Sequence, residues 1–73
     1  MKVEAVTLHF KPGVTSLGGT AFVSFSEGEA YQDLHYIARD GQHVVNYHDP
    51  ATGRRHGIGF PMGDIRQTNT VLL

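Results

Sequence analysis

The dipeptide Asp40-Gly41 constrains the fold more than any other feature, because the runs on either side of it can both be strands. A two-residue hairpin turn of type I′ needs positive φ at both central positions, and Asp-Gly is a preferred pair there. With that turn Ile37 faces Val44, and Asp33 lies opposite His48. The side chains that then share one face are Leu34, Tyr36, Ala38, Val45 and Tyr47. The spacing predicts an antiparallel hairpin with an apolar face, in which Leu34 faces Tyr47.

The same segment can also be interpreted as a helix at about 27–39. Ser26 and Glu29 would form a capping box, and Gly41 would end the helix. Against this, Tyr36 falls off the apolar stripe, and Gly28 in the first turn costs up to about 1 kcal/mol. The hairpin is therefore favoured, and an α+β fold with this helix is the alternative.

A second turn follows in "HDPATGRR", residues 48–55. Asp49 and Pro50 suit the start of a type I turn, and Gly53 suits a position of positive φ. If Asp49 faces Arg54, then Val45 faces Ile58, which extends the apolar face already described. Two turns interpreted independently thus predict one three-stranded meander, and such agreement is itself evidence for a fold.

The remaining runs predict strands at 2–10, 20–26 and 65–73, with a long loop at 11–19. Five or six short strands in 73 residues form one domain, 1–73, and predict an all-β, partly closed barrel. The strand order in "YIARDGQHVVNYHDPATGRRHGIGFPMGDI" and the segments around it resembles that of SH3-like barrels. An SH3 peptide groove needs acidic and aromatic residues in the first loop. The loop "KPGVTSLGG" has neither, so no functional residue is carried over.

Composition excludes several classes of protein. The chain has no cysteine, so disulfides and cysteine-containing metal sites are excluded. Six Lys and Arg against seven Asp and Glu leave it near neutral, whereas nucleic-acid binders are usually basic. No apolar run approaches the roughly 20 residues of a membrane helix, and "MKVEAVTLHF" is no signal peptide. We expect a soluble, cytoplasmic protein without a membrane partner.

Catalytic and metal-binding motifs are not evident. His35, His48 and Asp33 would lie near one another on the outer side of the first hairpin, but we interpret Asp33 and His48 as an opposite-charge pair. "SLGGT" lacks the spaced glycines and the lysine of a phosphate-binding loop. The expectation is a non-enzymatic protein with no metal and no cofactor.

The candidate binding residues are basic and lie mostly at one hairpin tip. Arg54, Arg55 and His56 form the one local basic cluster, and Arg39 and Arg66 are added as further candidates. With the loop at 11–19 they form the predicted partner-binding surface. The expected partner is a protein; the alternative is nucleic acid, bound through Arg39, Arg54 and Arg55.

The outer side of the first hairpin is not wholly polar, since Ile37 faces Val44 there. A sheet with apolar residues on both sides is either covered or makes an interface. A symmetric dimer is the commonest way to bury such a patch. Ile37 and Val44 are therefore predicted to form a homodimer interface; in the alternative, the loop at 11–19 folds over them.

Overall fold

The computed structural model describes residues 1–15 and 18–73, and almost all of its regular structure is strand. The strands are β1 (Val3–Phe10), β2 (Phe22–Ser26), β3 (Gln32–Arg39), β4 (Gln42–Asp49), β5 (Arg54–Pro61) and β6 (Ile65–Leu72). A short 3-10 helix, Met62–Asp64, connects β5 to β6. The all-β expectation is confirmed. No helix in the described ranges has the length and apolarity needed to cross a membrane.

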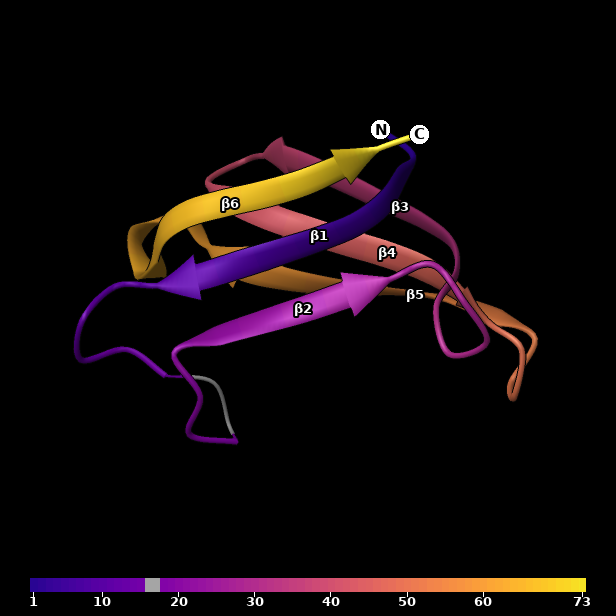
Figure 1. Cartoon of the computed structure of the whole chain (residues 1–73), viewed down its shortest axis with the longest axis horizontal. Coiled ribbons are helices and arrows are strands. Elements are labelled where there is room, and N and C mark those ends of the chain that lie inside the picture. Colours follow the sequence, from indigo (N-terminus) through magenta and orange to yellow (C-terminus); the bar gives the residue numbers. More distant parts are fainter. Residues whose placement is uncertain (16–17) are drawn as a thin grey trace.

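The strands form two antiparallel sheets that pack face to face, β2-β1-β6 and β3-β4-β5 (Figure 1). Both ends of the chain lie close together at one corner of this sandwich. The core between the sheets consists of Val3, Val6, Leu8, Phe10, Phe25, Leu34, Tyr36, Val45 and Ile65. Val6, Leu8 and Phe10 alternate along β1, and Leu34 and Tyr36 along β3, as expected for strands with one buried face. Ile58 and Phe60 of β5 are partly buried and pack against this core.

The β3–β4 hairpin turns at Asp40-Gly41, as predicted. Asp40 has φ 53° and Gly41 has φ 76°, the two positive values that a type I′ turn requires. Ile37 pairs with Val44, and Tyr36 pairs with Val45. The helix alternative at 27–39 is therefore wrong, because β3 occupies most of that range.

The predicted register fails at the start of β3. Gln32, not Asp33, pairs with His48, and the pairing is irregular between Gln32 and His35. Asp33 has φ 51°, which marks a bulge with an extra residue. The Glu27 carboxylate accepts hydrogen bonds from the backbone N–H groups of Asp33 at 3.0 Å and Leu34 at 2.9 Å. The predicted Asp33–His48 pair and the pairing of Leu34 with Tyr47 are therefore wrong, because these N–H groups bond a side chain instead of β4.

The second hairpin has the predicted register throughout. Asp49 pairs with Arg54, and Val45 pairs with Ile58. Gly53 has φ 70°, and its N–H donates to the Asp49 carbonyl at 2.9 Å. Ile58 consequently packs against the core on the side of the sheet that was expected.

The two sheets join at the beginning of β1. The Tyr36 N–H donates to the Met1 carbonyl at 2.8 Å, and the Met1 amino group donates to the Tyr36 carbonyl at 3.0 Å. A single bridge then pairs Lys2 with His35. Within residues 1–15 and 18–73 no ladder connects β5 to β6, so the barrel is not closed. The resemblance to SH3-like barrels stays a prediction from strand order.

Candidate functional site

The candidate site is the outer face of the β3-β4-β5 sheet, the face turned away from the second sheet. Tyr36 and Val45 are buried on the inner face, so their neighbours in sequence point outward. The residues of this outer face are His35, Ile37, Arg39, Gln42, Val44, Asn46, His48, Arg55, Gly57, Gly59 and Pro61. It divides into a polar half and an apolar half.

Arg55 organises the polar half. Its Nη1 donates to Asp33 Oδ2 at 3.0 Å, and its Nη2 donates to the Asp33 carbonyl at 2.8 Å. Its Nε donates to Asn46 Oδ1 at 2.8 Å. Lys2 Nζ lies 3.2 Å from Asp33 Oδ1. The Arg55 guanidinium is therefore bonded within the protein and ties β5 to β4 and to the bulge of β3.

These cations change the titration of Asp33. The side-chain hydrogen bond from Lys2 lowers the pKa of the Asp33 carboxyl below its ordinary value of 3.8. The positive charges of Lys2, His35 and Arg55 act in the same direction, while desolvation opposes them. A carboxyl whose pKa is lower in the folded protein stabilises the fold above its unfolded pKa, and this stability is lost as the pH falls through the folded pKa.

We expect Asp33→Asn to weaken the acid dependence of stability. The fall in urea midpoint between about pH 6 and pH 3 should be smaller in the variant than in the wild type, because one carboxylate no longer binds a proton on unfolding. Urea denaturation followed by circular dichroism measures this. Asp40→Asn, on the exposed turn, is the matched control and should keep the wild-type difference. An equal difference in all three proteins would contradict the assignment.

The apolar half is the Ile37–Val44 patch, two side chains that face each other across β3 and β4. Ile37 is 41% exposed, and Val44 is half-buried. Beyond Val44 lies Gly59, where a Cβ atom would come within 2.5 Å of Gln42 Oε1. The Gln42 side chain therefore lies over Gly59 and borders the patch on the side of β5. The loop at 11–19 follows β1 at the same end of the sandwich as the β3–β4 turn (Figure 1). Its described residues nevertheless leave Ile37 accessible.

The predicted partner-binding residues do not all come together. Arg54, Arg55 and His56 lie at the 49–54 turn, where Arg54 pairs with Asp49. Arg39 pairs with Gln42 beside the other turn, at the opposite end of the same sheet. Arg66 belongs to β6 in the second sheet. Residues 16–17 of the predicted loop lie outside the described residues. The grouping of these residues into one binding surface stays a prediction, as does the assignment of Ile37 and Val44 to a dimer interface.

Two histidines are engaged on the inner side of the sheet. His43 Nδ1 lies 2.6 Å from the Tyr36 hydroxyl. His56 stacks on Tyr47 with ring centroids 5.9 Å apart, and its Nε2 lies 3.6 Å from Asp49 Oδ2. His56 is therefore less available to a partner than its place in a basic run suggests.

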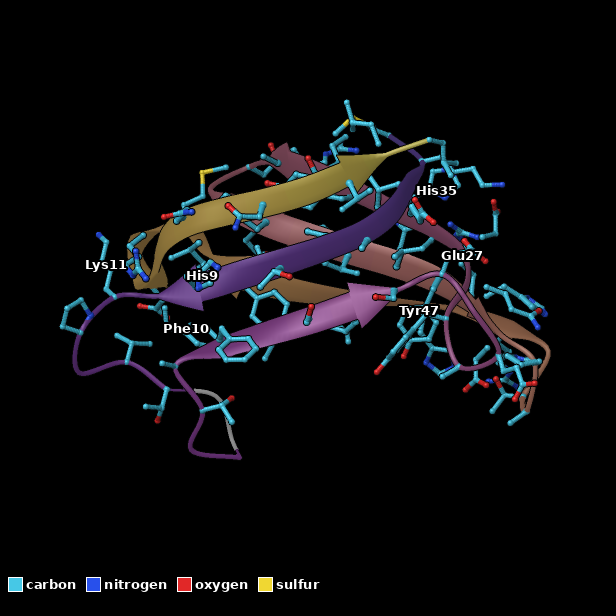
Figure 2. All side chains as sticks on the ribbon, in the orientation of Figure 1. His9, Phe10, Lys11, Glu27, His35 and Tyr47 are labelled. Atoms are coloured by element: carbon cyan, nitrogen blue, oxygen red, sulfur yellow. The ribbon has the colours of Figure 1, made fainter. Side chains whose placement is uncertain are left out.

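Sequence reasoning missed Glu27 and Asn46, which hold the bulge and Arg55. Figure 2 shows Glu27, His35 and Tyr47 at the end of the sandwich that carries the 49–54 turn, away from His9 and Lys11. Asn46 could have been found, because the predicted register already placed it on the outer face. The role of Glu27 could not be predicted, since it depends on a bulge for which the sequence contains no recognisable pattern.

The described part of the chain contains no pocket and no group of three or more side chains able to hold a metal ion. The surface is suited to binding another macromolecule, since it combines a small apolar patch, a hydrogen-bonded polar cluster and exposed backbone along β5. No family model, curated protein or solved structure matches this chain.

Proposed function

We propose that the protein is a non-enzymatic interaction module, a cytoplasmic homodimer that binds another protein through the outer face of β3-β4-β5. The observation that carries the proposal is the Ile37–Val44 patch on a sheet whose inner face is already covered. When a partner covers an exposed isoleucine, the removal of its apolar surface from water lowers the free energy of the complex. The polar cluster around Arg55 beside the patch gives the rigid, hydrogen-bonding rim that protein interfaces commonly have.

A protein partner has more support than nucleic acid. Phosphate-binding surfaces gather cations on one face, and their proteins usually carry excess positive charge. Here Arg39 and Arg54 lie at opposite ends of the sheet, and Arg55 donates to Asp33 and Asn46. The chain carries a net charge of −1. Cytoplasmic location accords with a chain that has no cysteine to oxidise.

We expect the double variant Ile37→Thr/Val44→Thr to lose partner binding while keeping the fold. Threonine retains the β-branched shape that suits a strand, but it weakens the apolar contact. The measurement compares the proteins captured from nuclease-treated lysate by the tagged wild type and by the variant, quantified by mass spectrometry. Phe22→Thr is the matched control, because Phe22 is an apolar side chain, 50% exposed, on the other sheet.

Proteins captured by the wild type and by Phe22→Thr, but lost from the double variant, would support the proposal. Capture that is equal for all three proteins would contradict it. Proteins captured from a parallel untreated lysate, but not from the nuclease-treated one, would favour the nucleic-acid alternative.

A further inference from the structure

Among the described residues, one side of β5 faces no other strand, and its backbone N–H and C=O groups form a regular series along that edge. The sheet order β3-β4-β5 makes β5 an edge strand of eight residues, paired with β4 without a register irregularity. The other three edge strands are less suited to pairing with another chain. Strand β2 has only five residues, and β3 begins with a bulge and bonds Met1. The pairing of β6 with β1 has two irregularities. Natural proteins guard edge strands with such devices, because an open edge pairs with other chains.

The bonding pattern identifies which groups face this edge. Tyr36 uses its N–H and carbonyl on Met1, so these groups point away from β4. Its partner Val45 must then point its own groups toward β5, where it bonds Ile58, because the two sides of an antiparallel strand alternate. It follows that the N–H and carbonyl groups of Gly57 and Gly59 point to the open edge. Both glycines are exposed.

We infer that two copies of this chain pair through the open edges of β5, antiparallel and about a two-fold axis at Gly57. In this register Gly57 bonds Gly57 of the partner subunit, and Arg55 bonds Gly59 of the partner subunit. Three facing pairs then supply six backbone hydrogen bonds, two from each pair. The inference rests on the proposed function, to which it adds the contact that joins the two copies.

Side chains favour a second copy in this register. Arg55 faces the partner's Gly59, which has no side chain of its own, so the side chain nearest to Arg55 there is Gln42 of the partner subunit, whose amide is polar. The two Arg55 residues stay four positions apart along the strand, whereas a shift of the axis to His56 would bring them nearer and make them repel each other. The basic end at Arg54 lies beside the partner's turn into β6, whose charged residue is Asp64. The strand is thus complementary to itself in shape and charge.

This contact is distinct from the Ile37–Val44 patch. Edge bonds lie in the plane of the sheet, so pairing produces one six-stranded sheet with both patches on its outer face. The sequence instead predicts a dimer contact at Ile37 and Val44. In the edge-paired dimer those side chains remain accessible to the partner protein.

Gly57→Pro tests the inference, with Gly57→Ala as its matched control. Proline removes an N–H that the sheet itself does not use, and edge strands tolerate it there. A Cβ at this position meets only Asn46 Cβ, at 4.0 Å, so the monomer has room for the Cβ atom of either residue. Because each copy loses a central bond, the dimer dissociation constant should rise about tenfold or more. The measurement is sedimentation velocity over a concentration series.

The wild type, Gly57→Ala and Ile37→Thr/Val44→Thr should sediment as dimers where Gly57→Pro sediments as a monomer. A monomeric wild type would overturn the inference, as would a Gly57→Pro protein that dimerises normally. Loss of the dimer in Ile37→Thr/Val44→Thr alone would also overturn it and would support the sequence assignment instead. The partner-binding part of the proposed function fails separately, when the double variant captures proteins normally.

A direct readout is independent of how the proline variant folds. In a mixture of labelled and unlabelled wild-type protein, an isotope-filtered NMR experiment should show contact between Hα of His56 and Hα of Ile58 of the partner subunit. These residues form a non-hydrogen-bonded pair in the proposed register, where Cα atoms approach most closely. A dimer without this contact overturns the inference.

Discussion

Leu34→Ala should reduce the free energy of unfolding by about 2–5 kcal/mol, the usual cost of truncating a buried leucine. Leu34 is 0% exposed and lies on β3, between the sheets. Its N–H also bonds Glu27, so the surrounding backbone is held and cannot collapse freely into the cavity. A 73-residue domain has roughly 4–11 kcal/mol of stability in all. The variant should therefore lose a large share of its stability, which urea denaturation followed by circular dichroism measures.

Ile37→Ala is the matched control for Leu34→Ala. It removes an aliphatic side chain of similar size from the same strand, but from the open outer face. We expect it to cost less than about 1 kcal/mol, because little buried area is lost. Equal costs at both positions would mean that the outer face is covered in solution, which repeating the measurement at low protein concentration would test.

Gly41→Val should destabilise the protein by about 1–3 kcal/mol, the cost of forcing a β-branched residue into left-handed backbone. Gly41 has φ 76°, and its added Cβ would meet nothing within 4 Å, so the expected loss is one of backbone conformation and not of packing. Urea denaturation measures it.

Two variants separate the backbone effect in Gly41→Val from the bulk of the new side chain. Gly41→Asn should retain most of the stability, because asparagine tolerates positive φ. Gly28→Val, at a glycine that also has open space around it but no positive φ, should cost little. A loss at Gly28 as large as that at Gly41 would contradict the turn assignment.

Much of the β3-β4-β5 sheet could be predicted because its register depends on local chemistry. Asp40-Gly41 and Asp49-Pro50 with Gly53 define turns whose φ values follow from the residue types. Once a turn is placed, the alternation of side chains decides which residues are buried. Tyr36, Val45 and Ile58 accordingly lie on the predicted face.

The candidate site was predictable only in part. Ile37 and Val44 were placed opposite each other on the outer face by the same register. The basic residues could not be grouped correctly, since Arg39 and Arg54 share a sheet but lie at its two ends. The hydrogen bonds between Arg55 and Asp33 could not be predicted either, because they depend on the bulge that changes the position of Asp33.

The sequence by itself determined the strands, the two hairpins and the identity of the buried face, because turn residues and two-residue periodicity act over short distances along the chain. Tertiary structure alone decided how the two sheets meet, through the bond of Glu27 to Leu34 and through the bond of Met1 to Tyr36, which are 35 residues apart. It also decided that the barrel is not closed and that β5 is a regular edge strand with exposed glycines. These features depend on which strands become neighbours in space, and local preferences carry no information about that.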